Sequence, residues 1–187
     1  MHYDVLKTLG DCHAAMDQRD QARECYLEAA VLEPALPGHQ IGLGILALLE
    51  GRLDEAAKAF EGALAAEANC PDAHWGMALV HWQRREYPQA VGACLRYVER
   101  QGDNRQAVRG LFHMGKRAGD LAVAAKFLDA LLQKHPGDTP LLLCQAEIQA
   151  ARGDAGAARQ TLLGILALEP QNAQAAQLLA ELKKAAT

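Results

Sequence analysis

The sequence has few aromatic residues and no apolar run long enough to cross a bilayer. Only nine of its 187 residues are Phe, Trp or Tyr, and alanine and leucine outnumber the β-branched residues. This mixture favours helices, because alanine and unbranched side chains lose little conformational freedom when a helix forms. The longest apolar run, Ile41–Leu49, is short and interrupted by glycines, and Met1–Asp11 carries no signal-peptide core. We therefore expect no membrane insertion and a cytoplasmic location.

Paired cysteines and an excess of positive charge are also missing. The cysteines are odd in number and contain no CxxC pair, which is typical of reduced packing residues in a cytoplasmic protein. The formal net charge is −4 and the pI is near 6, which argues against general binding of nucleic acid. No nucleophile with an orienting base, phosphate loop or ligand cluster is evident. We expect no enzyme activity, no metal and no cofactor.

What the sequence does contain is a period of 34 residues. An alanine recurs at this spacing along the whole chain, at Ala22, Ala56, Ala90, Ala124 and Ala158. Four places after each alanine stands a larger residue, at Tyr26, Phe60, Cys94, Leu128 and Leu162. Twelve places before it stands a small residue in four of the five copies, at Gly10, Gly44, Ala78 and Ala146, with Phe112 as the exception. Several columns that share one period indicate a repeat array.

The period divides the chain into five blocks and a final segment. The blocks are 3–36, 37–70, 71–104, 105–138 and 139–172, followed by 173–187. Each block contains two stretches with apolar residues at helical spacing, separated by a polar break that often holds glycine, as a helix end in the left-handed conformation would. Each block is therefore predicted to be two antiparallel helices. Segment 173–187 is predicted to be a capping helix with Ala176, Leu179 and Ala180 on one side.

This pattern resembles the tetratricopeptide repeat (TPR) family over residues 3–172. Members place large residues at positions 4, 7, 11 and 24 of a 34-residue unit and small ones at positions 8, 20 and 27. Position 20 is kept in every block here, whereas the aromatic preference at positions 4 and 11 is missing. The resemblance implies an all-α, right-handed superhelical solenoid of five helix-turn-helix units plus a C-terminal capping helix. It also implies that residues 1–187 form a single TPR domain.

The resemblance further implies that positions 2, 5, 6, 9, 12 and 13 of each block line a concave groove. In blocks two and three these positions carry large apolar side chains, namely Ile41, Ile45, Leu48, Trp75, Leu79 and Trp82. In each block the three apolar side chains are spaced so that they lie on one face of a helix. If exposed, the six together would form a larger apolar patch than is usual on the surface of a monomer. We expect them to bind the apolar part of a partner. In the alternative, block three rotates, Trp75 packs between helices, and His74 and His81 leave the core.

Block four carries a basic group at the groove positions, and three blocks carry glycine at position 6. The basic residues Arg109, His113, Lys116 and Arg117 suit a carboxylate, an acidic peptide or a phosphate, although a solvated charged face is the alternative. Glycine inside a helix is destabilising, so its recurrence indicates a close approach of other atoms to the backbone. Those atoms would belong either to a bound partner or to a neighbouring helix. The glycines are Gly42, Gly76 and Gly110.

The leading hypothesis is a protein–protein interaction module or adaptor. It would hold a partner peptide or helix in the concave groove, with apolar anchors over blocks two and three and acidic groups toward block four. Two alternatives remain open at this point. One is a self-associating structural scaffold, such as a homodimer, and the other is the recruiting domain of a larger enzyme.

Overall fold

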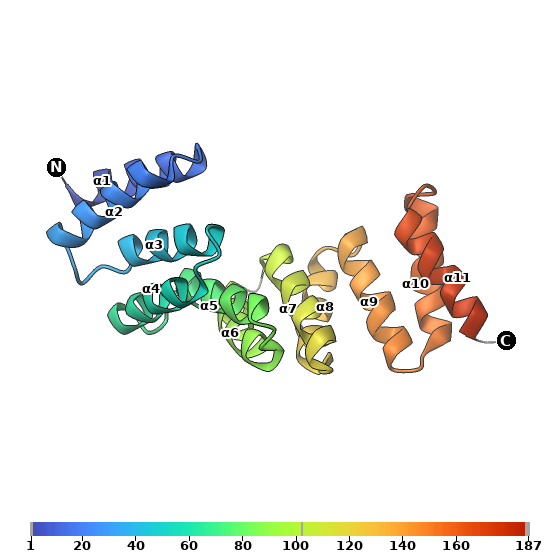
Figure 1. Cartoon of the computed structure of the whole chain (residues 1–187). Helices are drawn as coiled ribbons and strands as arrows, with labels where there is room; N and C mark the ends of the chain where they lie inside the picture. The colour runs from blue at the N-terminus through green and yellow to red at the C-terminus, as the bar shows by residue number, and fades with distance from the viewer. Residues whose placement is uncertain (1, 102, 186–187) are drawn as a thin grey trace. The chain divides into compact units, whose positions relative to one another are not determined.

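The structure, a computed structural model, describes residues 2–101 and 103–185, and within these ranges it contains eleven α-helices and no strand (Figure 1). The helices pair into five hairpins followed by one single helix. The predicted all-α fold of five helix-turn-helix units and a capping helix is therefore confirmed. The helices are α1 (Tyr3–Ala15), α2 (Arg19–Leu32), α3 (Gly38–Leu49), α4 (Leu53–Ala66), α5 (Pro71–Gln83), α6 (Tyr87–Arg100), α7 (Arg105–Ala118), α8 (Ala122–Lys134), α9 (Thr139–Ala151), α10 (Ala155–Leu168) and α11 (Ala173–Ala185).

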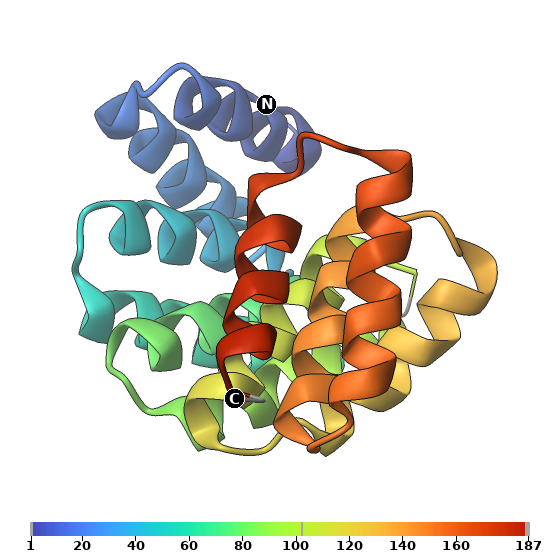
Figure 2. The same ribbon diagram turned by 90° about the vertical axis from the view of Figure 1, so that its right-hand side faces the viewer.

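The helices divide into two compact units, an N-terminal unit of α1 to α6 and a C-terminal unit of α7 to α11. In the N-terminal unit α1 contacts α3 and α3 contacts α5, so the first helices of neighbouring hairpins lie side by side. In the C-terminal unit α9 contacts α7 and α11 in the same way, and Figure 2 shows α10 and α11 side by side at its end. None of the described helices combines the length and the apolarity that a bilayer span requires. That residues 1–187 form one domain stays a prediction.

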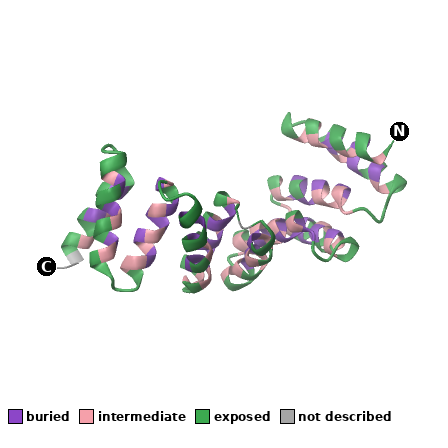
Figure 3. Cartoon of the chain, turned by 180° about the vertical axis from the view of Figure 1, so that it is seen from behind, coloured by how far each residue is buried: buried purple, intermediate pink, exposed green. Residues whose placement is uncertain are grey.

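The repeating alanine forms the centre of each hairpin. All five of these alanines are buried, as are the five larger residues that follow them by four places. Figure 3 shows buried residues in helices of both units. Ala22 and Tyr26 of α2 pack with Leu46 of α3, and Ala56 and Phe60 of α4 are in one cluster with Val80 of α5. A methyl group at this position lets two helix backbones approach closely, and the larger side chain then fills the space toward the next hairpin.

Glycines hold the aromatic rings of α2 and α4 between two helix backbones. A Cβ atom added to Gly42 would lie 2.4 Å from the ring of Tyr26, and one added to Gly10 would lie 2.6 Å from the same ring. Phe60 is held in the same way, with 2.7 Å to Gly44 and 2.4 Å to Gly76. Atoms of a neighbouring helix therefore approach Gly42 and Gly76, which is the second of the two explanations for glycine at these positions.

Each hairpin turn passes through one residue with a positive φ angle. Glycine occupies this position in three hairpins, as the sequence predicted, at Gly51, Gly119 and Gly153 with φ of 73°, 78° and 82°. In the other two hairpins Asp17 and Arg85 adopt φ of 58° and 61°. The left-handed conformation costs a residue with a side chain about 1–2 kcal/mol. The fold therefore keeps the turn geometry at all five sites even where the residue disfavours it.

Side-chain caps begin three helices of the C-terminal unit at intervals of 34 residues. The side chains of Asn104, Asp138 and Asn172 accept a hydrogen bond from the backbone N–H three residues later, at 3.1, 3.2 and 2.9 Å. Such a cap is worth about 1 kcal/mol. These caps are a second feature with the 34-residue period, and the spacing of apolar residues did not indicate them.

The capping helix packs through a face different from the predicted one. Leu179 is buried as expected, together with Ala175, in a cluster with Leu162 of α10. Ala176 and Ala180 are exposed, so their predicted packing role is wrong. The reason is register: α11 takes the place of the first helix of a sixth block and packs backward through positions 3 and 7. Positions 4 and 8 face the place of the second helix. Residues 186 and 187 of the predicted segment lie outside the described residues.

His39 is a buried histidine at the start of α3. Its ring packs edge to face against Tyr3, with centroids 6.1 Å apart, and its Nδ1 atom has no hydrogen-bond partner within the described part of the chain. Burial lowers the pKa of His39 below its usual value of 6.5. Burial likewise lowers the pKa of His74, although a hydrogen bond to the Ala68 carbonyl opposes the shift. The fold therefore favours the neutral form of both rings.

We predict that acidification destabilises the protein through these histidines. A histidine with a lowered pKa in the folded state binds fewer protons there than in the unfolded state. Its contribution is therefore intact above the unfolded value of 6.5 and is lost as the pH falls below it. Urea unfolding between pH 8 and 5 should show this loss, and His39→Leu should reduce the slope, since Leu141 occupies the same repeat position. An unchanged slope in that variant would contradict the assignment.

Relief of the turn at Arg85 should stabilise the protein. Arg85 is exposed, and Arg85→Gly removes the free-energy cost of its left-handed conformation in the folded state. Glycine also raises the conformational entropy of the unfolded chain, which offsets part of this stabilisation. We expect a net increase of about 0.5–1 kcal/mol in the free energy of unfolding. Arg85→Ala keeps a Cβ atom and should change little. Gly51→Ala, where an added Cβ meets nothing within 4 Å, should lose about 1 kcal/mol. Equal effects of the two Arg85 variants would count against the explanation.

Gly76→Ala should be destabilising although alanine is the better helix former. The new methyl group would overlap the buried Phe60 ring, which costs about 1–3 kcal/mol, more than the 0.5–1 kcal/mol gained in helix propensity. Gly92→Ala is the matched control, because an added Cβ in α6 meets nothing within 4 Å and should stabilise. Chemical denaturation compares the two. If both variants were equally stable, the ring would not be held as described.

Candidate functional site

A groove lies over the first helices of the N-terminal unit, with a volume of about 510 Å³. Five of the six predicted apolar groove residues line it: Ile41, Ile45 and Leu48 from α3, and Trp75 and Leu79 from α5. Glycine at Gly42 and Gly76 leaves the floor without side chains at two positions, and the ring of Phe60 forms part of it. We call this cavity the N-terminal groove. Nearly all of its lining residues stand at the repeat positions expected to face inward.

The two tryptophans have different surroundings. Trp75 lines the groove and also packs against Tyr97 of α6, with ring centroids 5.4 Å apart. Trp82 is half-buried and packs edge to face on Tyr87, also at 5.4 Å, and is not among the residues that line the groove. Trp75 is thus held in a fixed orientation at the wall, whereas Trp82 belongs to the packing between α5 and α6.

Block three has not rotated in the way the alternative required. His74 stays buried, and its Nε2 atom lies 3.2 Å from the carbonyl oxygen of Ala68. His81 is half-buried, with its Nδ1 atom 2.6 Å from a carboxylate oxygen of Glu86. The rotated arrangement, with both histidines outside the core, is therefore wrong for His74. The partner of His74 lies in the connection from α4 to α5, and the partner of His81 lies in the turn between α5 and α6.

The rim of the N-terminal groove is polar and carries more negative than positive charge. Lys7 donates to Asp11 at 2.6 Å, and the Tyr26 hydroxyl donates to the other oxygen of Asp11 at 2.9 Å. Burial and the Asp11 carboxylate raise the pKa of Tyr26, so its phenol remains a donor. Asp72 adds a second carboxylate at the rim. Two carboxylates and one ammonium favour a cationic or hydrogen-bond-donating group on whatever enters.

The predicted basic group on α7 is partly neutralised within the C-terminal unit. Lys116 forms an ion pair with Glu147 of α9, and Arg105, next to this group, pairs with Asp138 at 2.6 Å. His113 is exposed as a residue, but partial desolvation, with Arg109 and Lys116, lowers its pKa, while Glu147 opposes the shift. Arg109 and Arg117 are exposed as well. The surface is therefore less positive than the α7 sequence alone predicted.

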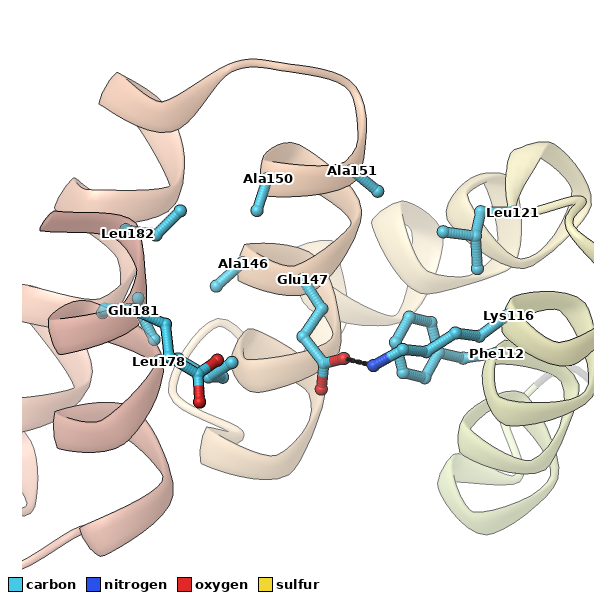
Figure 4. Close-up of a pocket in the computed structure, with 11 residues that line it drawn as sticks. Phe112, Lys116, Leu121, Ala146, Glu147, Ala150, Ala151, Leu178, Glu181 and Leu182 are labelled. Atoms are coloured by element: carbon cyan, nitrogen blue, oxygen red, sulfur yellow. Dashed lines mark hydrogen bonds and ion pairs between the residues drawn. The ribbon is translucent and has the colours of Figure 1, made fainter. Parts of the chain in front are cut away.

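A second cavity of about 320 Å³ lies between the first helices of the C-terminal unit. Figure 4 shows Leu178 and Leu182 of α11 across from Phe112 of α7, with Glu147 of α9 reaching toward Lys116 between them. Sequence analysis missed this cavity for two reasons. The apolar spacing predicts a different inward face for α11, and the 34-residue period marks Phe112 only as a large residue at a small position. The large Phe112, at the repeat position where the other four copies have a small residue, is the signal in the sequence that could have indicated this cavity.

Two groups with possible reactivity are held in inert surroundings. Burial raises the pKa of Cys94 to about 12 and is the main cause that raises the pKa of Cys144 to about 11, so both thiols stay protonated near neutral pH. Among the described side chains, no three of His, Cys, Asp or Glu type converge on one point. What the site offers is shape, apolar surface and a few rim charges, which are properties suited to binding.

Comparison with solved structures identifies the fold. YrrB, described as a TPR protein with an unusual peptide-binding site, is 18% identical, with a TM-score of 0.76 over 92% of this chain and 89% of that one. The pilF protein of Pseudomonas aeruginosa is 17% identical, with a TM-score of 0.77 over 98% of this chain and 83% of that one. A tetratricopeptide repeat protein from Parabacteroides merdae is 16% identical, with a TM-score of 0.78 over 96% and 72%. At these identities the likeness concerns the fold alone.

The sequence itself matches family models but no curated protein. Models described as Tetratricopeptide repeat match residues 8–68, 41–107 and 117–182. A search of curated proteins gave no significant match. The TPR fold generally mediates protein–protein interaction, and the family is a non-catalytic interaction module. Because its models match most of the chain and the hairpins have its length and packing, this protein belongs to the tetratricopeptide repeat family.

Proposed function

We propose that this chain is an interaction module that holds a segment of a partner protein in the N-terminal groove. The observation that carries the proposal is the convergence of Ile41, Ile45, Leu48, Trp75 and Leu79, from two neighbouring hairpins, on one open cavity. Ile45 is 46% exposed, so its side chain is accessible to a bound segment. The peptide-binding site of YrrB, a protein of similar fold, supports the same use of the array.

The partner segment would contribute apolar side chains and a positive charge or hydrogen-bond donor. Full burial of one leucine- or phenylalanine-sized side chain contributes about 1.5–3 kcal/mol. Association costs about 4–15 kcal/mol, so an interface with several such anchors reaches affinities of about micromolar order. Asp72 at the rim complements a lysine, an arginine or an amide donor beside the anchor, whereas Asp11 already accepts from Lys7 and Tyr26.

The structure supports the apolar part of the predicted partner better than the acidic part. Acidic groups were expected to meet the cations of α7. Lys116 already forms an ion pair with Glu147, and the neighbouring Arg105 pairs with Asp138. An acidic partner would have to displace these carboxylates, which reduces the net gain from each new ion pair. The proposal therefore centres on the N-terminal groove.

Selection from a displayed peptide library tests the proposal without knowledge of the natural partner. We expect the selected peptides to contain large apolar residues next to Lys or Arg. Ile45→Lys should weaken their binding at least about tenfold, because it places a charge where an apolar anchor is buried. Leu163→Lys is the matched control, since Leu163 is 48% exposed on α10 and lies outside the groove. Its affinity should be unchanged.

Trp75 provides a second readout of the same binding event. In a Trp82→Phe variant the remaining tryptophan is at the groove wall, so peptide binding should shift its emission to shorter wavelength. Peptides that bind equally well to the Ile45→Lys and Leu163→Lys variants, or that leave Trp75 emission unchanged, would contradict the proposal. Circular dichroism of each variant establishes that its helices are intact.

A further inference from the structure

The first helix of every later hairpin buries one face. Position 3 of the repeat is buried in five copies, at His39, Ala73, Ala107, Leu141 and Ala175. Position 10 is buried in four copies, at Leu46, Val80, Met114 and Ile148. These positions lie on one side of the helix, because a spacing of seven residues is close to two turns. Position 7, on the same side, is buried at Leu111 and Leu179 and half-buried in the other three copies. A face covered at positions 3 and 10 and at least half covered at position 7 is thus a regular feature of this array.

The first helix, α1, leaves the same face exposed. Val5 at position 3 is 52% exposed and Leu9 at position 7 is 40% exposed. Cys12 at position 10 is exposed, and Met16, one turn further, is 58% exposed. These four residues are spaced i, i+4, i+7 and i+11, so they form one continuous stripe along the helix. We call it the α1 stripe (Val5, Leu9, Cys12, Met16).

The later hairpins show what kind of element covers such a face. Leu43 and Leu46 of α3 pack against Ala22 and Tyr26 of α2. Val80 of α5 is in one cluster with Ala56 and Phe60 of α4. In both cases the covering helix presents a small residue followed four places later by a large one. The small residue allows close approach, and the large one fills the space beside it.

We propose that the α1 stripe is a docking site for an amphipathic helix of a partner protein. That helix would carry an alanine or glycine, a large apolar residue four places later and a further small residue three places after that, as α4 does with Ala56, Phe60 and Ala63. The docked helix would occupy the position that α2 takes against α3 and that α4 takes against α5. This surface is separate from the N-terminal groove, so the inference does not depend on the proposed function.

A second copy of this chain is a poorer occupant than a partner helix. The corresponding small-and-large rows of α2, α4, α6, α8 and α10 are buried in the described structure, so a second copy has no such row to offer. Its own α1 stripe consists of Val5, Leu9, Cys12 and Met16, without the small residue that close packing requires. Two such stripes would hold their helix axes apart and lose contact between side chains.

Cys12 makes occupancy of the stripe directly measurable. It is exposed, whereas Cys25, Cys70, Cys94 and Cys144 are buried. Native protein should therefore have one fast-reacting thiol toward a chromogenic disulfide reagent. The probe is a synthetic peptide with the sequence of α4, residues 53–66, and the control peptide carries Phe60→Ala. Alanine is the better helix former, so weaker binding of the control cannot result from lower helix propensity.

We expect the α4 peptide to slow the reaction of Cys12 about tenfold at a concentration near ten times its Kd, where about 90% of sites are filled. The control peptide should change the rate less than about twofold, because it lacks the large residue. Val5→Lys in the protein should abolish the protection. Leu27→Lys should not, and it is a matched control because Leu27 is 51% exposed on α2, close to the 52% of Val5.

Three results would overturn the proposal. The first is equal protection by the two peptides, and the second is no protection up to the solubility limit of the α4 peptide. The third is a Cys12 rate that already falls as the protein concentration rises, with a matching increase in mass by light scattering, since a second copy would then cover the stripe. The affinity of library-selected peptides for the N-terminal groove should be unchanged in the Val5→Lys variant. This measurement therefore distinguishes a failure of the α1 stripe proposal from a failure of the groove proposal.

Discussion

The packing of aromatic rings between glycine backbones is the contact on which the N-terminal unit depends. Tyr26 lies between Gly10 and Gly42, and Phe60 lies between Gly44 and Gly76. One glycine of each pair belongs to the ring's own hairpin and the other to the next hairpin. A single ring therefore sets both the spacing within a hairpin and the spacing between hairpins. Side chains as small as methyl groups would separate these helices, because protein interiors have no free volume to absorb them.

This packing also determines where a partner can bind. Since the glycines face the rings, the adjacent helix surfaces of α3 and α5 come close together and their apolar side chains gather over one floor, at Ile41, Ile45, Leu48, Trp75 and Leu79. In the C-terminal unit the rings are replaced by Leu128 and Leu162, and Phe112 stands where other hairpins have a small residue. A different cavity results, with Leu178 and Leu182 in its wall. One repeat pattern thus produces two surfaces of different chemistry.

The sequence predicted the helices well, because they follow from periodicity. Equivalent residues such as Ala22 and Ala56 have equivalent surroundings, and a period identifies equivalents. It does not identify contacts between non-equivalent residues. The ion pair of Lys116 with Glu147, the ring beside Gly76 and the inward face of α11 each depend on which helix lies opposite. The α1 stripe could not be predicted for the same reason, since its residues match their columns and differ from their equivalents in exposure alone.

The central claim is that the groove formed over α3 and α5 is the surface that takes a partner's apolar side chains. Nuclear Overhauser measurements on methyl-labelled protein with a groove-selected peptide address it most directly. The account predicts contacts from the peptide's apolar side chains to the methyl groups of Ile41, Ile45 and Leu79, and none to Leu163. Contacts confined to another face, with these three methyl groups unaffected, would contradict it.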